Sequence, residues 1–179
     1  MWQKKSSKVL LNHPRLTVIE DEIVLHTGKE SKYLRLEHNA NVASIIAIKG
    51  NNILLQKEYS YPVNKVLYQF PGGAVPMGED ISEGAQRELM EEVGLRAETL
   101  VPIGEYYLEH RRSDAKMYAF IGRDLVKEYR EPDPEEKIES LWLTEDKIDL
   151  LIKQGEIVNS HTLACWSLFK AHKDATTYK

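Results

Sequence analysis

The chain has 179 residues, of which 42% are hydrophobic, and this is enough to close the core of one globular domain. Its net charge of −4 predicts no basic surface for nucleic acid or anionic membranes, and no run of about eighteen apolar residues predicts a membrane-spanning helix. We expect a cytoplasmic protein, because no apolar leader follows Met1 and the single cysteine, Cys165, cannot form an internal disulfide. Cys165 lies in an apolar stretch and is expected to be a small buried hydrophobe.

Residues 1–40 are predicted to form an antiparallel β-ribbon. The pattern of alternating residues and turn residues predicts strands at 16–20, 22–26 and 32–38. Such a ribbon has little core of its own, so it must pack on the remaining domain, residues 41–179, or on another subunit. We therefore expect a homodimer in which the ribbon serves as an arm.

The remaining domain is predicted to combine strands with helices. Residues 49–52, Lys-Gly-Asn-Asn, separate two apolar runs and predict a hairpin. The predicted strands are 43–48, 53–56, 101–108, 115–121 and 138–143, and the predicted helices are 80–94, 145–154 and 160–172.

The best-defined helix is that of residues 80–94. Asp80 is placed to cap it, Glu83 to complete a capping box, and Gly94 to end it in the left-handed conformation. Its apolar residues share one face that can pack against a sheet, and they are Ile81, Ala85, Leu89 and Val93.

Three carboxylates, those of Glu88, Glu91 and Glu92, share another edge of this helix, because each residue advances the helix by about 100°. Arg87 is a neighbour of Glu91 one turn away. Crowded acids repel one another unless a cation offsets them, and Mg²⁺ prefers such oxygen ligands. Taken alone, such a cluster is more typical of a solvated helix face.

The spacing around the acids favours a functional site. Residues 73–95 read GAVPMGEDISEGAQRELMEEVGL and match each fixed position of the Nudix box. The chain therefore resembles the Nudix hydrolase family, loosely over residues 16–172. The segments 58–61, 68–73 and 155–157 resemble its ADP-ribose pyrophosphatase branch. The resemblance implies an α+β fold, the Nudix α/β/α sandwich with a mixed central sheet.

The resemblance also implies roles for the residues of the box. Glu88, Glu91 and Glu92, with the carbonyl of Gly72, would bind Mg²⁺ or Mn²⁺. Two further residues, Arg87 and Glu79, would orient these ligands. The bound ions would neutralise a diphosphate and activate a water molecule.

A general base is implied in the loop of residues 131–136, which precedes a late strand. Glu136 is the first candidate and Glu135 the second. An acidic, proline-stiffened loop without a catalytic role is the competing interpretation. In that case Glu88 would be the general base.

The implied substrate is a small nucleotide, a nucleoside diphosphate linked to another group, with ADP-ribose favoured over other nucleotide sugars. The chain departs from the branch at Ser60, where an arginine is common, at Gln69, where a glutamate is frequent, and at residues 110–112, where a proline is expected. The specificity for ADP-ribose is therefore open.

Four residues are candidates for substrate contacts. Tyr59 and Tyr61 could stack on a base, although alternating aromatics on a strand ordinarily pack. Arg111 and Arg112 could contact a phosphate or a sugar, although exposed arginines often contact nothing specific.

Two other functions fit the sequence. One is hydrolysis of dinucleoside polyphosphates or oxidised nucleotides, and the other is a non-catalytic sensor of nucleotide sugars. Sensors usually lose box carboxylates or gain a DNA-binding domain, and this chain shows neither change. The six histidines lack metal-ligand spacing, so we expect no zinc site.

Overall fold

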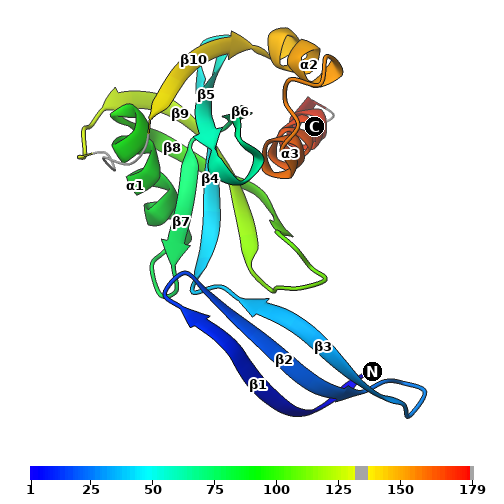
Figure 1. Ribbon diagram of the computed structural model, residues 1–179. Helices are drawn as coiled ribbons and strands as arrows, with labels where there is room; N and C mark the ends of the chain where they lie inside the picture. Colours follow the sequence, from blue (N-terminus) through cyan, green and yellow to red (C-terminus); the bar gives the residue numbers. More distant parts are fainter. Residues whose placement is uncertain (132–136, 178–179) are drawn as a thin grey trace.

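The computed structural model of the chain describes residues 1–131 and 137–177. A seven-stranded mixed sheet forms the body, with α1 on one face and α2 and α3 on the other side, and a three-stranded sheet extends away from it (Figure 1). This architecture confirms the predicted α+β fold with its N-terminal antiparallel unit. No described helix is long and apolar enough to span a membrane.

The N-terminal sheet is antiparallel in the order β1-β2-β3, with β1 at Gln3–His13, β2 at Leu16–Val24 and β3 at Glu30–Glu37. The prediction of two strands within residues 16–26 is wrong, because one strand, β2, runs through most of this segment. Asp21 lies at the predicted break, yet it is buried and accepts hydrogen bonds from Ser7 at 2.6 Å and Arg35 at 2.7 Å. The strand β1 was not predicted. Its sequence, QKKSSKVLLNH, lacks a regular alternation of apolar and polar residues, and all of its residues are exposed.

The central sheet has the strand order β10-β5-β4-β9-β8, with β6 added beside β5 and β7 beside β4. Strand β4 pairs in parallel with β9, which makes the sheet mixed, and the predicted β4–β5 hairpin is confirmed by the pair Lys49 and Asn52. The strand β7 was not predicted. The seven strands are β4 at Ala40–Lys49, β5 at Asn52–Ser60, β6 at Lys65–Gln69, β7 at Gly72–Pro76, β8 at Leu95–Tyr107, β9 at Lys116–Lys127 and β10 at Ile138–Thr144.

The three predicted helices are confirmed as α1 at Ile81–Val93, α2 at Glu145–Lys153 and α3 at Ser160–Thr177, and a 3₁₀ turn lies at Tyr61–Val63. Asp80 caps α1 as predicted, since its carboxylate accepts from the backbone N–H groups of Ser82 and Glu83 at 2.9 and 3.1 Å. Gly94 ends the helix with φ of 67°.

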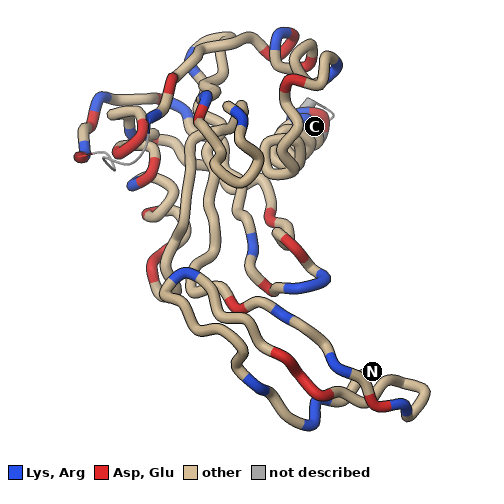
Figure 2. Tube along the Cα trace, in the orientation of Figure 1, with Lys and Arg blue, Asp and Glu red and all other residues tan. Residues whose placement is uncertain are grey.

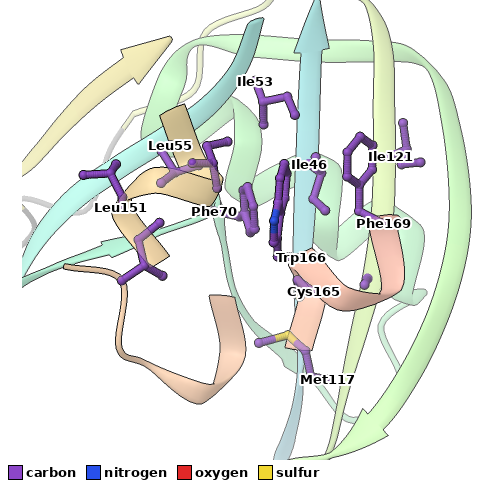
Figure 3. Close-up of a cluster of buried hydrophobic side chains, with 13 residues drawn as sticks. Ile46, Ile53, Leu55, Phe70, Met117, Ile121, Leu151, Cys165, Trp166 and Phe169 are labelled. Atoms are coloured by element: carbon purple, nitrogen blue, oxygen red, sulfur yellow. The ribbon is translucent and has the colours of Figure 1, made fainter. Parts of the chain in front are cut away.

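Two cores lie on the two faces of the central sheet, because side chains alternate along β4. Ile45 and Leu89 belong to the core between the sheet and α1. Ile46 belongs to the core under α3, where it lies with Trp166, Phe169 and the buried, predicted Cys165 (Figure 3). The sheet therefore fixes α1 on one face, with its charged edge near β7.

Candidate active site

The charged edge of α1 is organised by Arg87. Its guanidinium donates to three carboxylates: from Nε to Glu79 at 3.1 Å, and from Nη1 to Glu88 at 2.7 Å and Glu91 at 3.0 Å. Its Nη2 donates to the carbonyl of Ala74 on β7 at 3.0 Å and to Glu79 at 3.2 Å. The hydrogen bond with Glu79 is the main reason that the pKa of Arg87 is raised. The planar fork of an arginine suits this arrangement, which a lysine could not reproduce.

Glu88 is the most buried of these acids, with 15% of its side chain exposed. Burial raises its pKa, although the hydrogen bond from Arg87 opposes the shift. Its carboxylate lies against the backbone of Gly73, where an added Cβ would stand 2.6 Å from Oε2 of Glu88. The glycine at this position of the box therefore leaves room for the carboxylate.

Glu92 contacts the sheet instead. Its Oε2 accepts from Nε2 of Gln56 on β5 at 3.0 Å and from the N–H of Gly72 at 3.1 Å. Gly72 has φ of 147°, and a Cβ there would lie 2.1 Å from the carbonyl oxygen of Ala43 on β4. Only glycine permits this close approach of β7 to β4, which brings the Gly72 N–H to Glu92.

Two cavities lie beside the box. One, of about 450 Å³, is lined by Gly73, Arg87, Glu88 and Glu91. The other, of about 600 Å³, extends from Gly72 to the start of α3. Val42 of β4 lines both cavities.

Two guanidinium groups contact the acids in the described part of the chain. Arg87 bonds Glu79, Glu88 and Glu91, and Arg130 lies 3.9 Å from Glu91. Figure 2 shows that acidic residues gather on α1 and on the segment before it. Together with Glu92 on the same helix, these carboxylates offer the oxygen ligands that a hard divalent cation prefers.

The side chains are nevertheless arranged as ion pairs and not as a ligand cage. In residues 1–131 and 137–177, no three His, Cys, Asp or Glu side chains are placed to hold one metal ion. Arg87 bonds Glu88 and Glu91, while Glu92 bonds β5 and β7. The donor set fits the ion, and these carboxylates would have to exchange partners to bind it.

The predicted substrate contacts fall in two places. Tyr59 and Tyr61 line the 600 Å³ cavity, with exposed fractions of 51% and 83%. Arg111 and Arg112 line neither cavity at the box. Arg112 instead donates to the carbonyl of Leu34 at 3.1 Å and so joins the loop after β8 to the N-terminal sheet.

The predicted bases, Glu135 and Glu136, lie outside the described residues. Three site residues were not predicted: Arg15 and His38, which line the 450 Å³ cavity from the N-terminal unit, and Gln56. The first two are brought to the box only by the tertiary fold. Gln56 does have a signal in the sequence, since it is a polar residue that directly follows the apolar run Ile-Leu-Leu of β5.

Known proteins with similar sequences and folds identify the family of the chain. The chain is 27% identical over 144 residues to an ADP-ribose pyrophosphatase of Bacillus subtilis (strain 168), covering 79% of this chain and 78% of that protein. It is 28% identical over 140 residues to the ADP compounds hydrolase NudE of Escherichia coli (strain K12), covering 76% and 75%. A solved structure described as an ADP compounds hydrolase shares the fold with a TM-score of 0.90 at 20% identity, over 98% of this chain and 95% of that one.

The family model of the NUDIX domain matches residues 38–164. This range includes the whole box, the helix α1 and the strands that carry Gln56 and Gly72. The resemblance to the ADP-ribose pyrophosphatase branch is confirmed by the two relatives. The chain therefore belongs to the Nudix family.

Proposed function

We propose that this Nudix protein hydrolyses the pyrophosphate bond of a nucleoside diphosphate linked to another group, with ADP-ribose as the favoured substrate, and that it requires Mg²⁺ or Mn²⁺. The observation that carries the proposal is the set of box carboxylates: Glu79, Glu88 and Glu91 bond Arg87, which lines a 450 Å³ cavity, and Glu92 lies on the same helix. The names of the two relatives support an ADP-containing substrate.

Glu88, Glu91 and Glu92 would hold the metal, with the carbonyl of Gly72. A bound divalent cation neutralises the diphosphate and lowers the pKa of a coordinated water. Arg87 donates hydrogen bonds to two of these carboxylates and so fixes their orientation. This role of the guanidinium agrees with the one that the box implies.

Other residues around the two cavities would bind and orient the substrate. Arg15 and His38 line the 450 Å³ cavity and offer donors to a phosphate. Tyr59 and Tyr61 line the neighbouring cavity and offer faces for a base. The proposed general base is Glu136 or Glu135, with Glu88 as the alternative.

The experiment that tests the proposal is a substrate panel with Mg²⁺ and with Mn²⁺, in which the products are identified. The panel contains ADP-ribose, ADP-glucose, NADH, a diadenosine polyphosphate and 8-oxo-dGTP. The proposal expects AMP and ribose 5-phosphate from ADP-ribose. Preferred turnover of the last two compounds would support the alternative hydrolase, whereas binding of a nucleotide sugar without turnover would support the sensor.

We also propose a homodimer in the cytoplasm. The single cysteine, Cys165, is buried, which suits a reducing compartment. Val9 and Leu11 of β1 are 57% and 54% exposed, and a second copy of the chain would cover such a surface. Light scattering should give twice the 20.6 kDa mass of the chain, and replacing both residues with lysine should halve it. A monomeric wild-type protein would contradict the dimer.

A further inference from the structure

Gln56 occupies a position in β5 where an apolar side chain would be expected. It is fully buried, as are Ile53, Leu54 and Leu55 before it. Because strand residues alternate, Gln56 faces the same side of the sheet as Leu54, which belongs to the core between the sheet and α1. The strand therefore ends its buried run with an amide group pointed at the charged helix.

The amide of Gln56 is only half satisfied. A carboxylate accepts hydrogen bonds, so Nε2 is the end that faces Glu92, at 3.0 Å. The other end, Oε1, has no hydrogen-bond partner among the described residues and is buried. A buried acceptor without a partner lowers the stability of the fold, and this offsets part of what the hydrogen bond to Glu92 contributes.

The amide nitrogen of Gln56 is the end of the side chain that contacts the site. Gln56 and the N–H of Gly72 donate to the same oxygen of Glu92, and together they direct its carboxylate toward the sheet. Glu88 and Glu91, in contrast, are held by Arg87 within the helix. The amide thus constrains a box carboxylate from outside the box.

We propose that Gln56 is a positioning residue that sets the orientation of Glu92 for metal binding. This inference rests on the proposed function, in which Glu92 is a metal ligand. Groups that hold a ligating carboxylate commonly change metal affinity by ten- to a hundredfold when they are removed. The fold then tolerates the unsatisfied carbonyl oxygen of Gln56 because the amide nitrogen of the same side chain orients a metal ligand.

The test compares Gln56→Met, which keeps the length and removes both polar ends, with the wild-type protein. Binding of Mn²⁺ alone is measured by titration with electron paramagnetic resonance, and the Tm of the metal-free protein by calorimetry. The dissociation constant for Mn²⁺ should rise by about tenfold or more. The Tm should fall less than in a variant that breaks a fully satisfied amide, because removal of the unsatisfied acceptor offsets part of the lost hydrogen bond to Glu92.

Gln86 provides the matched control. It is also a buried glutamine, but both ends of its amide are satisfied, by the carbonyl of Ala97 at 2.6 Å and the N–H of Ala97 at 3.1 Å. Gln86→Met should lower the Tm by about 4 °C or more and leave Mn²⁺ affinity unchanged. Gln56→Met is therefore expected mainly to weaken Mn²⁺ binding, and Gln86→Met mainly to lower the Tm.

Gln56→Leu serves as a second variant if Gln56→Met does not fold. Mn²⁺ affinity within twofold of wild type in a folded variant, or a fall in Tm like that of Gln86→Met, would overturn the inference and leave the proposed function intact. A folded wild-type protein that does not bind Mn²⁺ would refute the proposed function, and the inference with it.

Discussion

Replacing Arg87 with alanine should destabilise the metal-free protein by removing the common partner of three acids. The side chains of Arg87, Glu88 and Glu91 are 22%, 15% and 27% exposed, so the pairs are only partly open to solvent. A charged hydrogen bond contributes about 1.5 to 3 kcal/mol, and this exposure reduces the total to about 3 kcal/mol. For a chain of this size, the Tm should fall by roughly 6 to 12 °C.

Calorimetry of the metal-free protein measures this loss, and Arg96→Ala is the control. Arg96 lies 3.9 Å from Glu128 with 46% of its side chain exposed, so its removal should cost less than about 1 kcal/mol. Added Mg²⁺ should restore part of the lost stability in Arg87→Ala, because a cation again offsets the carboxylates. Equal Tm values for the two arginine variants would refute the role of Arg87 as the common partner.

Four further outcomes are expected. Glu92→Gln should lower turnover by about a thousandfold, roughly 4 kcal/mol of barrier, and EDTA should abolish wild-type activity; turnover that persists in EDTA would exclude the metal mechanism. Gly73→Ala should reduce kcat by about tenfold with little change in Tm, since the added methyl displaces the flexible carboxylate of Glu88, and an unchanged kcat would show that this contact is unimportant. Glu136→Gln should lower kcat about a hundredfold with KM nearly constant, and wild-type kinetics would move the base elsewhere. Asp21→Asn should destabilise the protein at pH 7. Burial opposes the charge of Asp21, but its hydrogen bonds hold its pKa below the usual value, so the charged carboxylate stabilises the fold above the unfolded pKa of about 4 and stops doing so as the pH falls. An equal loss of unfolding free energy at pH 7 and at pH 3, measured with urea, would contradict this.

The elements that could be predicted carry their signals within a few residues. The helix α1 has its cap at Asp80 and its stop at Gly94, and both determine the backbone locally. The β4–β5 hairpin is determined in the same way by Gly50, which has φ of 60°. The box also placed Arg87 beside Glu91, because residues four apart on a helix are neighbours.

The elements that could not be predicted depend on distant partners. Strand β7 is rich in glycine and proline, and it is a strand only because it pairs with β4 thirty or so residues earlier. Asp21 is typical of a turn, but its partners on β1 and β3 keep it within β2. The bond from Gln56 to Glu92 joins residues that are 36 positions apart. Helical periodicity places Glu92 on an edge of α1 but does not reveal which strand it contacts.

The N-terminal sheet is joined to the body by hydrogen bonds as well as by the polypeptide connection from β3 to β4. The backbone N–H of Leu36 donates to the carbonyl of Arg112 at 2.7 Å, and Tyr33 donates to the carbonyl of Arg111. Arg15, in the turn between β1 and β2, lines the same cavity as Arg87. Truncation before residue 40 would therefore remove a cavity wall along with the arm, and a loss of activity in such a fragment would not distinguish failed assembly from failed substrate binding. Point substitutions on the exposed face of β1 separate the two effects, since they leave Arg15 and the backbone bonds in place.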